Sequence, residues 1–178
     1  MARFIETELT LDHQYDPKTS RHYLNNQLSV LHCHHYATLY SQLADDVEFV
    51  DGKKLLADVA EDTFYSVLQE YFDANSIVTV NDKISIAEQY FAATGLGQMN
   101  VVYLGHESAE VELVHSHVDE GWIKKWGKRQ APVNFITQGY IAALVSLVNN
   151  KSTKNYQVIE EESIVSGAKR SLFKAVLQ

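Results

Sequence analysis

The chain has 178 residues, of which 46% are hydrophobic and 21% charged, and it contains one cysteine. A chain of this length and composition can bury a core as one domain, which excludes disordered, collagen-like and disulfide-built proteins. The formal net charge of −8 disfavours nucleic acid and anionic membranes as partners, because like charges repel.

Features of membrane-spanning and secreted proteins are also missing from the sequence. No stretch approaches the roughly 18 consecutive apolar residues that a membrane span requires. Residues 1–13 contain no hydrophobic block of the length found in signal peptides. We therefore expect a cytoplasmic protein with no membrane span.

The first 80 residues are predicted to form one strand and two helices. Alternating apolar and polar residues predict a strand over residues 4–11. Apolar residues at three- and four-residue spacing predict a helix over 20–43. Asp51 is predicted to cap a longer helix over 53–75, because an aspartate can accept a hydrogen bond from the first backbone amides of a helix.

The remaining residues mix helices with strands. A third helix, capped by Asn81, is predicted to end at Gly95 and Gly97. The following elements are predicted as strands over 98–104, 107–117, 157–163 and 170–177, and helices over 118–128 and 134–150. We therefore predict an α+β fold with helices packed on a mostly antiparallel sheet, in a single domain over residues 1–178.

Two pairs of histidines are candidates for a metal or haem site. His32 and His35 lie three apart on the predicted first helix, and His115 and His117 lie two apart on a predicted strand, so each pair shares a face. Imidazole is a ligand for zinc, copper and haem iron. The structural alternatives are a hydrogen-bonded His35 in the core and a strand end that turns polar at His117. A composite site that joins the two pairs is a third possibility.

No catalytic set is recognisable. Gly95-Leu96-Gly97 follow a helix and precede a strand, which is the reverse of the order in a dinucleotide- or phosphate-binding loop. There is no GxSxG motif, and the carboxylate run at 160–162 mixes the two faces of a strand. The sequence therefore favours a protein that is not an enzyme.

Several segments after Ile84 share a pattern of glycines and apolar spacing. They are Thr94–Gln98, Met99–Leu104, Ala109–Val114, Pro132–Ala143, Val158–Glu161, Gly167 and Leu172–Val176. In this pattern the C-terminal half resembles the 4-vinyl reductase (hydrocarbon-binding) domain family. That family belongs to the ligand-binding fold shared with haem-nitric-oxide sensors and with Bet-type subunits of the Golgi vesicle-tethering complex.

The resemblance implies a ligand-binding core over residues 81–178 that encloses an apolar cavity, and a homodimer formed through helices. Many members of the family carry cysteines that hold a metal. The matching positions in this sequence are Asn134, Ser163 and Ser171. The chain therefore departs from the family at the positions where the family has its metal-holding cysteines.

These observations predict a binding or sensory domain for a small apolar or aromatic molecule, acting as a homodimer. The side chains expected to line its pocket come from helix and strand faces that are predicted to point inward: His35, Tyr36, Tyr90, Phe91, His115, Phe135 and Tyr140. One alternative is a haem or divalent-metal protein, either an enzyme or a binding protein, that uses His32, His35, His115 and His117. The other is a dimeric scaffold without a ligand.

Overall fold

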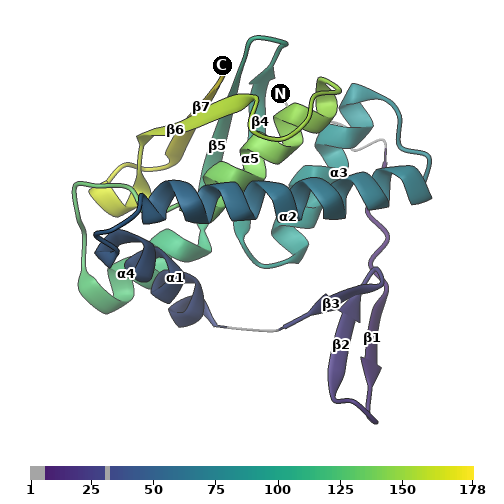
Figure 1. The fold of residues 1–178 in the computed structure, drawn as a ribbon, viewed down its shortest axis with the longest axis horizontal. Helices are drawn as coiled ribbons and strands as arrows, with labels where there is room; N and C mark the ends of the chain where they lie inside the picture. Colours follow the sequence, from purple (N-terminus) through teal and green to yellow (C-terminus); the bar gives the residue numbers. More distant parts are fainter. Residues whose placement is uncertain (1–6, 31–32) are drawn as a thin grey trace.

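Two antiparallel sheets and five α-helices make up the described part of the chain, residues 7–30 and 33–178 of a computed structural model (Figure 1). The larger sheet has the strand order β4-β5-β7-β6. Its strands are β4 (Gly97–Leu104), β5 (Ser108–Ser116), β6 (Tyr156–Glu162) and β7 (Ser171–Leu177). The predicted α+β class and the predicted strands of this sheet are confirmed, except that β5 ends at Ser116. His117 begins the next helix because Ser116 caps it, so His115 and His117 do not share a strand face as predicted.

The helices pack in layers on this sheet. They are α1 (His34–Asp46), α2 (Gly52–Ala74), α3 (Val80–Ala93), α4 (His117–Trp126) and α5 (Phe135–Val148). Helix α5 lies between α2 and the sheet, which explains why its sequence is apolar on all sides. Gly139 of α5 permits this contact, because a Cβ atom there would lie 2.2 Å from the carbonyl oxygen of Ala57 in α2.

Side-chain caps mark the starts of α2 and α3. The Asp51 side chain accepts a hydrogen bond from the backbone N–H of Lys54 at 3.0 Å, so the predicted cap of α2 is confirmed. Helix α3 begins two residues earlier than predicted, because Thr79 and not Asn81 accepts a hydrogen bond from a backbone amide of its first turn. Within the described residues, no helix is long and apolar enough to cross a membrane.

The N-terminal prediction is wrong over most of its length. Residues 7–11 form no strand, and residues 4–6 of the predicted strand lie outside the described part of the chain. A three-stranded sheet follows, formed by β1 (His13–Asp16), β2 (Arg21–Leu24) and β3 (Gln27–Ser29). Of the described residues in the helix predicted over 20–43, only those from His34 onward form a helix.

The turn between β2 and β3 gives the physical reason. Leu24 pairs with Gln27, which leaves Asn25 and Asn26 as a two-residue loop with φ angles of 48° and 65°. Asparagine tolerates this left-handed conformation, and two such residues form the tight turn that suits a hairpin. We call residues 12–30 the arm; its sheet projects from the helical body (Figure 1).

Candidate functional site

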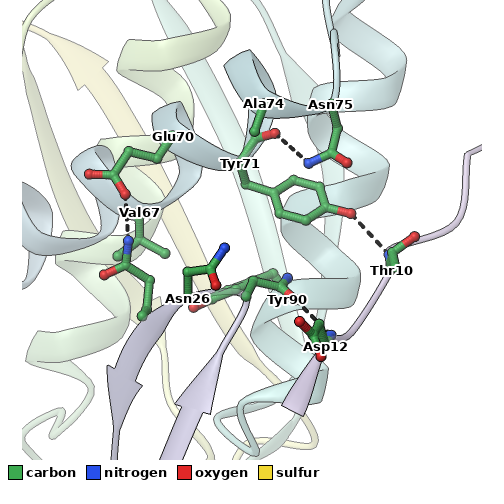
Figure 2. A pocket seen from close by; sticks show the side chains of 11 residues that line it. Thr10, Asp12, Asn26, Val67, Glu70, Tyr71, Ala74, Asn75 and Tyr90 are labelled. Atoms are coloured by element: carbon green, nitrogen blue, oxygen red, sulfur yellow. Dashed lines mark hydrogen bonds between the residues drawn. The ribbon is translucent and has the colours of Figure 1, made fainter. Parts of the chain in front are cut away.

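A hollow of about 350 Å³ lies where the arm meets the C-terminal half of α2 (Figure 2). We call it the junction pocket. Its lining comes from the arm and the segment before it, from α2 and the residue after it, and from α3: Thr10, Asp12, Asn25, Asn26, Gln27, Val67, Glu70, Tyr71, Ala74, Asn75 and Tyr90. Tyr90 is thus a predicted lining residue that does line a pocket.

Hydrogen bonds around the junction pocket join the arm and the segment before it to the body, and also connect residues within the arm. The hydroxyl oxygen of Tyr71 accepts a hydrogen bond from the backbone N–H of Thr10 at 2.9 Å, and Gln27 donates to Glu70 (Figure 2). The side-chain oxygen of Asn25 accepts from the backbone N–H of Asp12 at 2.8 Å. The side-chain nitrogen of Asn25 is buried and has no hydrogen-bond partner. The wall of this pocket therefore includes a residue with an unused, covered donor.

The other predicted aromatic residues of the core pack against one another. The ring centroids of Phe91 and Tyr140 are 5.0 Å apart, and those of Phe64 and Tyr140 are 4.7 Å apart. The Tyr140 hydroxyl donates to the carbonyl oxygen of Ala87 at 2.7 Å, and burial raises the pKa of Tyr140 well above its ordinary value. Phe91 and Tyr140 belong to the core and line neither the junction pocket nor the groove described next.

A second hollow, of about 580 Å³, is a groove between α2, the first half of α5 and β6. It includes the predicted residue Phe135. Seven of its lining side chains carry an ionisable acid or amine: Asp51, Lys53, Lys54, Asp58, Glu61, Lys154 and Glu160. Only Asp12 and Glu70 do so in the junction pocket. An uncharged aromatic molecule is therefore better suited to the junction pocket than to the groove.

The remaining predicted residues lie on the surface of the other end of the molecule. His35, Tyr36 and His115 are exposed, and none of them lines either hollow. The Nδ1 atom of His115 lies 3.6 Å from a carboxylate oxygen of Glu120. His32 lies outside the described residues.

His34, which is not one of the predicted site residues, lies near two of the predicted histidines. The ring centroid of His34 lies 4.2 Å from that of His35 and 5.8 Å from that of His117. Partial burial, followed by the neighbouring His35, lowers the pKa of His34. Over residues 7–30 and 33–178, no three histidine, cysteine or acidic side chains are grouped so as to hold a metal ion.

Asn134, Ser163 and Ser171, the three positions that the sequence resemblance pairs with cysteines, converge on one buried carboxylate. Asp119 is fully buried in α4 and accepts four hydrogen bonds. Its Oδ2 accepts from Asn134 Nδ2 at 2.7 Å and Ser171 Oγ at 3.3 Å, and its Oδ1 accepts from the Val165 N–H at 3.1 Å and Ser163 Oγ at 3.4 Å. We call Ser116, Asp119, Asn134, Glu160, Ser163 and Ser171 the polar centre. All six are buried.

These side chains do not fit the metal that the family resemblance implies. A cysteine site supplies soft thiolates, whereas the three matching positions here supply an amide and two hydroxyls. The amide nitrogen of Asn134 also donates to Glu160 Oε1 at 2.9 Å, so a hydrogen-bond donor occupies the space between the two carboxyl groups. No ion pair among the described residues involves Asp119 or Glu160.

Glu160 is the least satisfied member of the polar centre. Its side chain is 6% exposed, and its Oε2 is buried without a hydrogen-bond partner. Burial, and then the nearby charge of Asp119, raises the pKa of Glu160 from the ordinary 4.5 to about 7. Sequence reasoning missed this residue, although its spacing from the inward-facing Tyr156 and Val158 places it on the same face of β6.

Comparison with known proteins supports the fold. The sequence matches no protein-family model and no curated protein. The structure is similar to the phenol-responsive sensory domain of the transcription activator PoxR, solved with phenol, with a TM-score of 0.74 and 14% identity over 93% of this chain and 84% of that one.

A second solved structure is subunit 3 of the trafficking protein particle complex from Naegleria fowleri, covalently bound to palmitic acid. It gives a TM-score of 0.53 and 14% identity over 80% of this chain and 90% of that one. Neither comparison names a 4-vinyl reductase domain. The chain therefore has the fold that a phenol-responsive sensory domain and a trafficking-complex subunit also have.

Proposed function

We propose that this chain is a non-catalytic binding or sensory domain for a small aromatic or apolar molecule, and that it acts as a homodimer. The observation that carries the proposal is the junction pocket, with two tyrosines and an unused amide donor in its wall. Its support from outside the chain is the fold likeness to a phenol-responsive sensory domain over 93% of the residues.

The size and chemistry of the junction pocket favour a single-ring molecule with one oxygen function. Its volume of about 350 Å³ is near the lower end of known ligand pockets. The Asn25 amide nitrogen is covered in this structure, and a small rotation of the side chain would let it donate to a hydroxyl or carbonyl oxygen of the ligand. The Tyr71 hydroxyl accepts from Thr10, so its own proton is available for donation to the same ligand.

The position of the pocket supplies a route from binding to a response. The arm contributes Asn25 and its neighbours, while α2 and α3 contribute Tyr71 and Tyr90. A ligand that contacts both sides strengthens the attachment of the arm to the body. Binding then shifts the arm toward one position, in proportion to the difference in affinity between its two states.

A face of α1 supports the homodimer. Tyr36, Leu39, Tyr40 and Leu43 follow the three- and four-residue spacing of one helix face, and all four are exposed, Tyr36 by 55% and Leu43 by 53%. Phe49, in the connection to α2, is 87% exposed. Grouped apolar side chains of this kind mark protein contact surfaces in soluble proteins.

Binding is tested by calorimetric titration with phenol, benzyl alcohol and toluene. We expect phenol and benzyl alcohol to bind more tightly than toluene, because only they supply an oxygen to Asn25. Asn25→Asp keeps the acceptor and removes the donor, so it should weaken phenol binding about tenfold or more. Ala74→Trp should fill the pocket, whereas Ala93→Trp, also at the last residue of a helix, should not. Equal binding by both tryptophan variants would refute this pocket.

The homodimer is tested by light scattering on a sizing column. Leu39→Glu with Leu43→Glu should convert the dimer to a monomer, because two charges would be buried in an apolar contact. Val78→Glu with Val102→Glu places the same charges at exposed positions away from α1 and should leave the mass unchanged. A monomeric wild type would remove this part of the proposal.

A further inference from the structure

We infer that the polar centre is a metal-independent clasp, in which the Asn134 amide takes the place of a cation between Asp119 and Glu160. The inference goes beyond ligand binding. It concerns the stability of the end of the molecule that lies opposite the junction pocket. It also separates this chain from the metal-holding cysteines that the family resemblance implies.

The orientation of the Asn134 amide is fixed from its oxygen side. Ser116 Oγ accepts a hydrogen bond from the Asp119 backbone N–H at 3.1 Å, so its own proton is free to be donated to Asn134 Oδ1, which lies 2.9 Å away. The amide nitrogen must therefore face the two carboxyl groups. A bound cation would need the opposite orientation, with the amide oxygen facing inward.

The donors of the Asn134 side chain are fully used. An amide nitrogen has two protons, and here one goes to Asp119 at 2.7 Å and the other to Glu160 at 2.9 Å. Charge-assisted hydrogen bonds to carboxylates are stronger than those between neutral groups. One neutral amide thus connects two acidic side chains that would otherwise repel each other in a buried place.

The clasp connects elements that are distant in the sequence. Asp119 belongs to α4, Asn134 precedes α5, Glu160 belongs to β6 and Ser171 to β7. Ser171 Oγ also accepts from the backbone N–H of Ile164 at 3.0 Å, which holds the connection between β6 and β7. The hydrogen bonds of the polar centre therefore hold α4 and the start of α5 against β6 and β7.

The first test is metal analysis of the full chain, purified without a metal-affinity step, with the melting temperature measured in millimolar EDTA and again in millimolar zinc. We expect a substoichiometric metal content and a melting temperature that neither treatment changes. Stoichiometric metal, together with a melting temperature that EDTA lowers and metal restores, would overturn the inference.

The second test exchanges donor and acceptor within the clasp. Asn134→Asp removes both donors and adds a third acid, and it should lower the melting temperature by about 10 °C. Adding Glu160→Gln returns the polar centre to two acids and one amide, with position 160 now donating to the carboxylate at position 134, and should recover part of the loss. Asn150→Asp, at an exposed asparagine just beyond the other end of α5, is the matched control and should have little effect.

The outcome of the exchange is informative even if Asn134→Asp does not fold. Recovery of a folded protein by the double variant supports the clasp, because generic damage at Asn134 would not be repaired by a change at Glu160. A double variant that is no more stable than Asn134→Asp contradicts it. The metal measurement on the wild type decides independently of both variants.

Discussion

Replacing Glu160 by glutamine should remove a pH dependence from the stability of this protein. The side chain is 6% exposed, and its Oε2 has no hydrogen-bond partner, so the neutral amide preserves the shape and avoids a buried charge. Burial and Asp119 raise the pKa of Glu160 from 4.5 to about 7. At about 1.4 kcal/mol for each pH unit, this difference corresponds to about 3 kcal/mol of unfolding free energy.

The sign of the effect follows from which state holds the proton. In the unfolded chain the Glu160 carboxyl ionises above pH 4.5, whereas in the folded chain it keeps its proton until about pH 7. The unfolded state therefore binds fewer protons between these values, and the wild type loses stability as the pH rises from 4.5 through 7. Below pH 4.5 the full contribution is present, and above about pH 8 the loss is complete.

The assay is urea unfolding followed by tryptophan fluorescence at constant ionic strength from pH 5 to pH 8.5. The quantity to plot is the unfolding free energy of Glu160→Gln minus that of the wild type, because other titrating groups cancel in this difference. It should rise with pH by up to about 3 kcal/mol. Glu161→Gln, at an exposed neighbour on the same strand, is the control and should give a flat line. A flat line for Glu160→Gln as well would refute the reasoning.

Three further changes test the packing of the fold. Gly139→Ala should cost about 1–3 kcal/mol in urea unfolding, because its Cβ would lie 2.2 Å from the Ala57 oxygen and would force α2 and α5 apart. Tyr140→Phe should cost about 1–2 kcal/mol, because it removes the buried hydrogen bond that the Tyr140 hydroxyl donates to the Ala87 carbonyl. His34→Gln should reduce the loss of thermal stability as the pH falls through 6.5, because the lowered pKa of His34 means that the unfolded chain is protonated first.

Each of these changes has an outcome that would contradict it. Tyr103→Phe, at a 54% exposed tyrosine, is the control for Tyr140→Phe, and equal stability of the two variants would contradict the buried hydrogen bond. A Gly139→Ala protein as stable as the wild type would mean that the two helices are not in contact at that glycine. Parallel acid profiles for His34→Gln and the wild type would exclude His34 as the group that titrates.

Most of the sheet and the four C-terminal helices could be predicted from the sequence, because their local signals agree with their tertiary surroundings. On β5, Ala109, Val111 and Leu113 alternate with more exposed residues and are fully buried. Helix α5 is apolar throughout and lies between two layers. In each case the apolar residues that form the sequence pattern are the same residues that are buried in the structure.

The arm could not be predicted from periodicity. Leu24 and Leu28 stand four apart, which is typical of a helix face, but each belongs to a different strand of one hairpin. Leu28 is 60% exposed, so burial does not enforce the pattern on which the prediction depended. The turn at Asn25-Asn26 was the available signal, because two asparagines in sequence tolerate the positive φ angles that the hairpin needs.

The candidate site was predicted only in part for a related reason. A helix stripe shows that Tyr90, Phe91 and Tyr140 face inward, but it does not show whether an inward side chain lines a pocket or contacts another ring. That choice depends on residues distant in the sequence: Asn25 and Tyr71 meet Tyr90 at the junction pocket, whereas Phe91 and Tyr140 meet each other.

The two ends of the α2–α5 layer differ in how they are held, and this difference bears on function. At the N-terminal end of α5, Asp119, Asn134 and Glu160 form a buried network with many hydrogen bonds of long sequence separation. At the C-terminal end of α2, the arm is attached through the Gln27–Glu70 contact, and the segment before it through the Thr10–Tyr71 contact, at the rim of the junction pocket. Segments with few buried contacts open at the lowest free energy. If a ligand binds in the junction pocket as proposed, it would act on the part of the molecule that opens at the lowest free energy, while the clasp would keep the body fixed.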